Sequence, residues 1–264
     1  MKKSEVKFSK YQILFMLILI IMMIIFEFID MPLFQNLEDE GIITDSIMRL
    51  LGGIAFIIIL TGFGYAKIFQ IKHFWKSLFI IIPALIISIN NFPIIAFFDG
   101  RALLSAPEYR IYLFLFECLC IGFYEEIIYR GIILGILFQN LAKTKNGLLK
   151  AIVFSSFVFG LSHLLNLFSG AAIGDTVLQI GYSFLLGTLW AVMYLKTQNL
   201  WLTMLLHATY NFFGQVMFRL GTVEGRFDIY TVIITVVLAV LVAIYTIGIF
   251  KQLKEREAIT PKPI

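Results

Sequence analysis

The amino-acid sequence predicts an all-α protein that crosses a membrane several times, and three observations lead to this fold class. Hydrophobic residues make up 60% of the 264 residues and charged residues only 14%, whereas soluble domains average roughly 45–50% apolar and about 25% charged residues. The mean hydropathy is +0.91. The apolar residues also form long runs, which must be helical in lipid because a helix satisfies its own backbone hydrogen bonds.

Eight apolar segments are predicted to be membrane helices, since each approaches the roughly 20 residues that a span requires. Pro93, in the sequence Asn-Asn-Phe-Pro, removes a backbone donor and predicts a kink or break in the third segment. No other stretch is long enough to fold alone, so residues 1–264 are expected to form a single integral membrane domain. The predicted segments are about 12–31, 47–66, 77–98, 110–138, 148–168, 176–195, 200–219 and 228–250.

Basic residues are divided unequally between the two sides of this predicted bundle. Fifteen lysines and arginines fall on the side that carries both termini and five fall on the other side. Because Lys and Arg accumulate in cytoplasmic loops, both termini are expected in the cytoplasm of a multi-pass cell-membrane protein. The first segment lacks a small-residue cleavage site and is interpreted as a retained anchor. The net charge of +4 therefore reflects orientation in the bilayer, and no nucleic-acid partner is expected.

The fourth segment places three charges inside an apolar run, in the stretch GFYEEIIYRGIILG at residues 122–135. Charges at membrane depth are costly and usually mark a functional site or a buried partner. Glu126 and Arg130 are four residues apart on one helix face and are predicted to form an ion pair. Glu125 is rotated by about 100° from Glu126, which leaves it available for chemistry. Gly131 and Gly135 have the spacing of small residues at a close helix contact.

Two later segments carry polar residues at the same four-residue spacing. Phe159 and His163 share a face of the fifth segment, and His207 and Asn211 share a face of the seventh. At about 1.5 Å per residue, the depths of Glu125 and these polar side chains agree within roughly 12 Å, which is compatible with one shared site. Each feature alone has a simple alternative as an interhelical hydrogen bond. Their joint occurrence on three helices favours a functional site.

These residue types favour a reaction in which water is the nucleophile. A glutamate in an apolar setting with cations nearby has a pKa that is pushed toward the range where a general base works best. Glu125, helped by His163, is expected to take a proton from water, and the hydroxide would attack a peptide carbonyl. His207 and Asn211 would donate to the oxyanion that forms. Arg130 would hold Glu126.

The three motifs together resemble a known family. The pattern EExxxR (Glu125, Glu126, Arg130), then FxxxH (Phe159, His163), then HxxxN (His207, Asn211) is similar to that of the CAAX protease and bacteriocin-processing family, also called CPBP or Abi. The motif-bearing core covers about 110–215. The resemblance implies a CAAX-protease-like core bundle and a glutamate-dependent intramembrane endopeptidase that needs no metal. It also implies a peptide or protein substrate at the membrane.

Several alternatives stay open at this stage. Two histidines and a glutamate are a donor set that zinc can use, although no HExxH sequence is present. A non-catalytic member of the family would act as an immunity protein or as a regulator of a sensor kinase. A proton-coupled transporter is disfavoured, because no pair of broken helices marks the two halves. The family name points to prenylated CAAX peptides, whereas bacterial relatives are linked to peptide processing and bacteriocin immunity.

Overall fold

The computed structural model describes residues 10–11, 14–15, 17–18, 21–22, 39–225 and 228–253. Within the predicted first segment, the described residues are helical, and the remainder of 12–31 lies outside the described residues. The predicted cytoplasmic location of the two termini also rests on residues outside these ranges.

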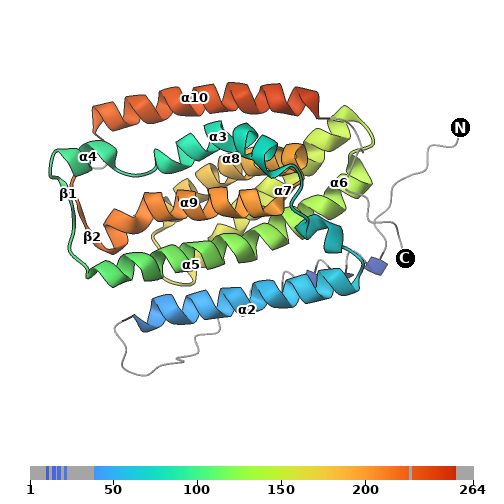
Figure 1. The fold of residues 1–264 in the computed structure, drawn as a ribbon, viewed down its shortest axis with the longest axis horizontal. Helices are drawn as coiled ribbons and strands as arrows, with labels where there is room; N and C mark the ends of the chain where they lie inside the picture. Colours follow the sequence, from blue (N-terminus) through green and yellow to red (C-terminus); the bar gives the residue numbers. More distant parts are fainter. Residues whose placement is uncertain are drawn as a thin grey trace, which may run out of the picture.

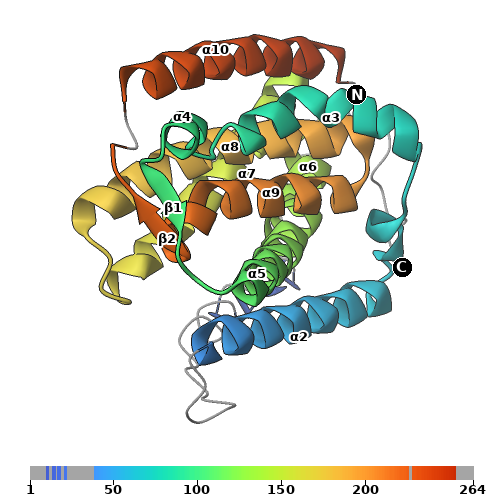
Figure 2. The same ribbon diagram turned by 60° about the vertical axis from the view of Figure 1, so that its left-hand side comes forward.

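The described chain forms an all-α membrane-type bundle, as predicted. Figure 1 shows α2 and α10 on opposite sides of the bundle, with α5, α9 and α3 between them. Figure 2 shows the same arrangement from a second direction. The helical elements are α2 (Glu40–Gly62), η1 (Ala66–Phe69), α3 (Phe74–Ile89), α4 (Ile94–Phe98), α5 (Glu108–Glu126), η2 (Ile127–Leu134), α6 (Gly135–Leu141), α7 (Lys145–Ser162), η3 (His163–Leu167), α8 (Ile173–Thr197), α9 (Leu200–Arg219) and α10 (Ile229–Gln252).

Four helical stretches in the described part of the chain are long and apolar enough to cross a membrane. They are Glu40–Gly62, Lys145–Leu167, Ile173–Thr197 and Ile229–Gln252, and α3 is a shorter apolar helix. Only 11% of the most apolar window of α10 is buried by the rest of the protein. Because its exposed side chains are almost all apolar, α10 is suited to face lipid. The count of eight spans stays a prediction.

The predicted break at Pro93 is present. Helix α3 ends at Ile89, and α4 begins at Ile94 with Pro93 at its N-cap position. Asn91, in the turn between them, donates from Nδ2 to the carbonyl of Tyr210 in α9 at 3.1 Å. Pro93 cannot donate a backbone hydrogen bond, and its ring favours the start of a helix over the interior.

A short antiparallel strand pair was not predicted from the sequence. Strand β1 (Ala102–Leu104) pairs with β2 (Gly221–Val223), which follows α9 directly. Beside them, Arg101 binds Asp99 at 2.7 Å and Asp228 at 3.4 Å. Hydrogen bonding to Arg101 lowers the pKa of Asp99, so this carboxylate is ionised at neutral pH. The connection before α5 is thereby joined to the connection after α9.

Candidate active site

The helix that carries the charged motif changes its winding at the motif. Glu125 and Glu126 end the regular helix α5, and the next eight residues, Ile127–Leu134, form the π-helix η2. All eight are buried, including Arg130. Isolated π-helical turns occur frequently at functional sites, because the wider turn changes the direction of the side chains that follow it. The sequence contains no signal that predicted this change.

The predicted ion pair between Glu126 and Arg130 is present and fully buried. Arg130 donates from Nη1 to Oε1 of Glu126 at 2.6 Å, and the two side chains are 1% and 0% exposed. Nη2 of Arg130 donates to the backbone carbonyl of Gly187 in α8 at 3.3 Å. A buried charge requires a partner and hydrogen bonds to offset its lost hydration. Arg130 has both.

His207 of α9 lies between the two glutamates. Its Nδ1 is 3.0 Å from Oε1 of Glu126, and its Nε2 is 3.7 Å from Oε2 of Glu125. Because the ionised Glu126 carboxylate only accepts hydrogen bonds, Nδ1 must carry the proton and donate it. The remaining nitrogen, Nε2, therefore faces Glu125. The Glu125 side chain is 24% exposed, in contrast to the inaccessible Glu126.

Aromatic rings surround this charged group. Phe159 of α7 lies with its ring 4.5 Å from the Arg130 guanidinium carbon, 5.3 Å from the His163 ring and 5.7 Å from the His207 ring. Trp190 of α8 stacks on His207 with ring centroids 4.5 Å apart. Aromatic faces attract cations, most strongly when water is excluded. Phe159 therefore contacts the charged group, and its supporting role stays a prediction; Trp190 was not predicted.

His163 and Asn211 complete the predicted residue set. His163 begins η3 at the end of α7, is partly buried, and has its Nδ1 3.4 Å from Oγ of Ser162. Asn211 is partly buried and lies one turn beyond His207 on α9. The described contact that joins Glu125 to a histidine is with His207. The expected partnership of Glu125 with His163 stays a prediction.

A glycine allows the two helices of the site to approach closely. A Cβ atom on Gly122 of α5 would lie 2.7 Å from the carbonyl oxygen of Met204 and 3.1 Å from the amide nitrogen of Ala208 in α9. Gly122 is one turn before Glu126, and Met204 and Ala208 flank His207 on α9. Close approach at Gly122 thus brings Glu126 within hydrogen-bonding distance of His207.

We expect Gly122→Ala to lower both stability and any activity of the site, because the added methyl group forces α5 and α9 apart. Overpacking a buried contact typically costs about 1–3 kcal/mol, which exceeds the roughly 0.5–1 kcal/mol that alanine gains over glycine in a helix. Gly135→Ala is the matched control, since nothing lies within 4 Å of its added Cβ. Thermal unfolding of both variants in detergent checks this, and equal midpoints would contradict it.

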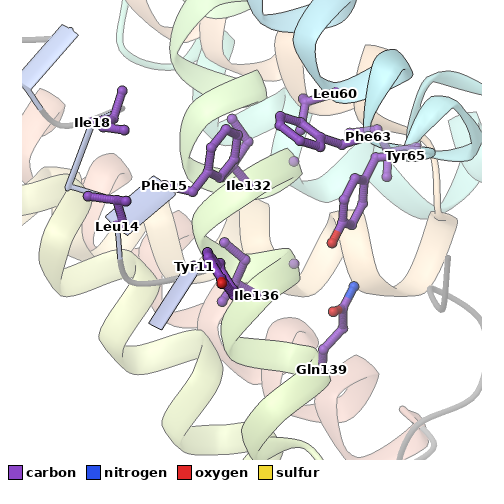
Figure 3. Close-up of a pocket in the computed structure, with 13 residues that line it drawn as sticks. Tyr11, Leu14, Phe15, Ile18, Leu60, Phe63, Tyr65, Ile132, Ile136 and Gln139 are labelled. Atoms are coloured by element: carbon purple, nitrogen blue, oxygen red, sulfur yellow. The ribbon is translucent and has the colours of Figure 1, made fainter. Parts of the chain in front are cut away.

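Gly131 and Gly135 differ in how closely other residues approach them. A Cβ on Gly131 would meet Ile68 at 3.3 Å and Leu200 at 3.6 Å, whereas one on Gly135 would meet nothing within 4 Å. Both glycines also line an apolar cavity of about 360 Å³. Figure 3 shows this cavity, with the ends of Tyr65 and Gln139 turned toward each other at one edge. The expectation of close packing is therefore wrong for Gly135.

A second buried carboxylate on α5 belongs to a different cluster. Glu117 is 3.6 Å from Nη1 of Arg219, and its side chain is 3% exposed. Arg219 also lies over the ring of Phe114, 5.3 Å from its centroid. Among the described residues, no three His, Cys, Asp or Glu side chains are grouped so that they could hold a metal ion.

These features define a helical membrane protein with a buried site of glutamates, histidines and an arginine. Residues 107–213 match the family model described as Type II CAAX prenyl endopeptidase Rce1-like. This region of the chain is therefore similar to the CAAX protease family. The matched region contains all seven residues that the sequence motifs singled out. No match to this chain was found among curated proteins, and none among solved structures.

Proposed function

We propose that this protein is an intramembrane endopeptidase that hydrolyses a peptide bond in a membrane-associated peptide or protein, with water activated by Glu125. The observation that carries the proposal is the group Glu126, His207 and Glu125, in which a buried carboxylate orients an imidazole toward a partly exposed carboxylate. A site of this kind can accept and donate protons within the membrane. The similarity of residues 107–213 to the family model supports the reaction class, because that model describes an endopeptidase.

The first step uses Glu125 as general base. Its carboxylate takes one proton from a water molecule, and the resulting hydroxide oxygen forms a bond to the carbonyl carbon of the substrate. His163, placed beside Phe159, would form a second hydrogen bond to the same water molecule. Partial exposure of Glu125 gives the water access to this carboxylate, whereas Glu126 has no such access.

The second step stabilises and then collapses the tetrahedral intermediate. Asn211 donates from its amide to the oxyanion, and His207 donates from Nε2 when the ring carries both protons. Glu126 supports the doubly protonated ring by accepting from Nδ1. As the oxyanion re-forms the C=O bond and the C–N bond breaks, the carboxylic acid of Glu125 returns its proton to the leaving nitrogen, which gives a carboxylic acid and an amine as products and restores the Glu125 carboxylate.

The substrate is a peptide or protein at the membrane, and the bilayer is the other expected partner. A prenylated C-terminal peptide is the substrate named in the family description, and peptide processing without a prenyl group is the other class we consider. The alternative function is non-catalytic, as an immunity protein or a regulator of a sensor kinase. It rests on the associations of the family, and no contact in the described site favours it.

The proposal is tested by presenting candidate peptides, prenylated and unmodified, to the purified protein in lipid nanodiscs. We expect defined cleavage products by mass spectrometry from the wild type, and a large loss with His163→Ala. Activity should survive a zinc chelator, because the mechanism uses no metal. Loss of activity on chelation, restored by zinc, would replace the general-base mechanism with a zinc site. A biological effect that persists in variants without cleavage would support the non-catalytic alternative.

A further inference from the structure

Helix α8 contributes two residues to the site that none of the three sequence motifs contains. Gly187 and Trp190 are three residues apart on this helix, so they lie on neighbouring positions of one face. Both contact the charged group, Gly187 through its backbone carbonyl and Trp190 through its ring. Helix α8 thus forms one side of the site, in contact with Arg130 of η2 and His207 of α9.

Trp190 acts on the charged group through the faces of its indole ring. The ring stacks on His207 at an interplanar angle of 25°, and the Arg130 guanidinium carbon lies 5.3 Å from its centroid. The indole N–H is buried and has no hydrogen-bond partner among the described residues. A hydrogen bond therefore does not account for a tryptophan here, whereas an indole face is the aromatic surface that holds cations best.

Gly187 permits the second contact between α8 and the charged group, which is the hydrogen bond from Arg130. Its carbonyl accepts from Nη2 of Arg130, and a Cβ at this position would lie 3.0 Å from the Phe159 ring and 3.3 Å from Nη2. A side chain would therefore push Arg130 or Phe159 away. The absence of a side chain at position 187 lets α8 lie close enough for Trp190 to reach His207.

We propose that Trp190 is a positioning residue that holds the imidazole plane of His207, so that Nδ1 meets Glu126 while Nε2 faces Glu125. The hydrogen bond from Nδ1 to Glu126 sets the direction of the ring nitrogens, and Nε2 lies 3.7 Å from Glu125, but these contacts leave the ring able to rock about the line that joins the two nitrogens. The stacked indole removes this freedom. The proposal rests on the proposed peptidase function for its kinetic consequence, but the stacking itself is independent of any reaction.

The kinetic test compares Trp190→Phe with Trp190→Leu. Phenylalanine keeps an aromatic face and should retain most of the activity, whereas leucine fills the space without a flat surface. We expect Trp190→Leu to lower kcat about 10- to 100-fold, the scale of loss that small misplacements of catalytic groups produce. KM should change little, because Trp190 acts by orienting His207 and not by binding the substrate. Equal kcat in the wild type and Trp190→Leu, or a loss confined to KM, would overturn the proposal.

A second measurement needs no substrate. The sequence has three tryptophans, so replacing Trp75 and Trp201 by phenylalanine leaves Trp190 as the only one whose fluorescence is measured. A protonated imidazole quenches an indole with which it is in contact, so emission should fall on acidification. Around His207 the titratable and charged groups are Glu125 and Glu126 from α5, Arg130 from η2 and His163 from η3.

Two histidine variants show which imidazole quenches the emission of Trp190. His207→Gln in the single-tryptophan background should abolish the fall in emission, whereas His163→Gln should preserve it. Quenching that survives His207→Gln would overturn the stacking and with it the proposal. If quenching depends on His207 but no peptide is ever cleaved, the proposed peptidase function fails while the contact of Trp190 with His207 stands.

Discussion

Replacement of Glu125 by glutamine is expected to abolish peptide cleavage while leaving the protein folded. Glutamine matches glutamate in shape but cannot accept a proton from water at neutral pH. General-base catalysis typically contributes about 10²–10⁴-fold to a rate, so kcat should fall by about that factor or more. The fold should tolerate the change, because the Glu125 side chain is 24% exposed and is not part of the buried ion pair. Cleavage rates and thermal unfolding, measured on the same preparation, check both halves of this expectation.

Glu117→Gln provides the matched control for this variant. Glu117 lies on the same helix and is even more buried, but it pairs with Arg219 and not with a histidine. We expect it to leave kcat within a few-fold of the wild type. Glu125→Gln with undiminished cleavage would show that another group activates the water. Equal losses in the two variants would show that any change in the charge of α5 disturbs the site.

The helical framework was largely predictable because hydrophobic runs in a membrane have few structural solutions. Helix α9 spans Leu200–Arg219, the same range that the apolar run predicts, with Asn199 before it and strand β2 soon after it. The strand pair and the π-helix were not predicted. The strands have only three residues each and depend on a partner about 120 residues away, and η2 is as apolar as the α-helix around it.

The candidate site was predictable where its contacts are local. The pair Glu126 and Arg130 follows from a four-residue spacing within one helix. The bond between Glu126 and His207 joins residues 81 positions apart and required the packing of α5 on α9 at Gly122. Trp190 could not be distinguished by sequence from any other aromatic residue in an apolar helix. It becomes significant only when its stacking on His207 is seen.

Glu126 connects the stability of the bundle to the geometry of the site. The same atom, Oε1, accepts from Arg130 and lies 3.0 Å from Nδ1 of His207. Arg130 balances the charge of Glu126, and Glu126 in turn sets which nitrogen of His207 faces Glu125. A substitution that disturbs Arg130 is therefore expected to act on the fold and on the imidazole at once.

Replacement of Arg130 by methionine is accordingly expected to destabilise the protein strongly. Removal of one partner of a buried ion pair leaves an uncompensated charge and typically costs about 3–5 kcal/mol. Glu126 would be that charge, since its side chain is 0% exposed. We expect a lower unfolding midpoint in detergent and a lower yield from membranes. The double variant Arg130→Met with Glu126→Gln should recover much of the lost stability, because it buries no charge, yet it should not recover activity.

Arg49→Met tests whether burial causes the effect. Arg49 pairs with Asp45 at the same four-residue spacing, with 3.1 Å between the charged atoms, but the Asp45 side chain is 55% exposed. Pairs in contact with water are worth only about 0.2–1 kcal/mol, so Arg49→Met should shift the unfolding midpoint far less than Arg130→Met. Similar shifts for the two variants would contradict the assignment. An Arg130→Met protein with wild-type stability and activity would show that Glu126 is held by His207 alone, and that the arginine contributes nothing to the site.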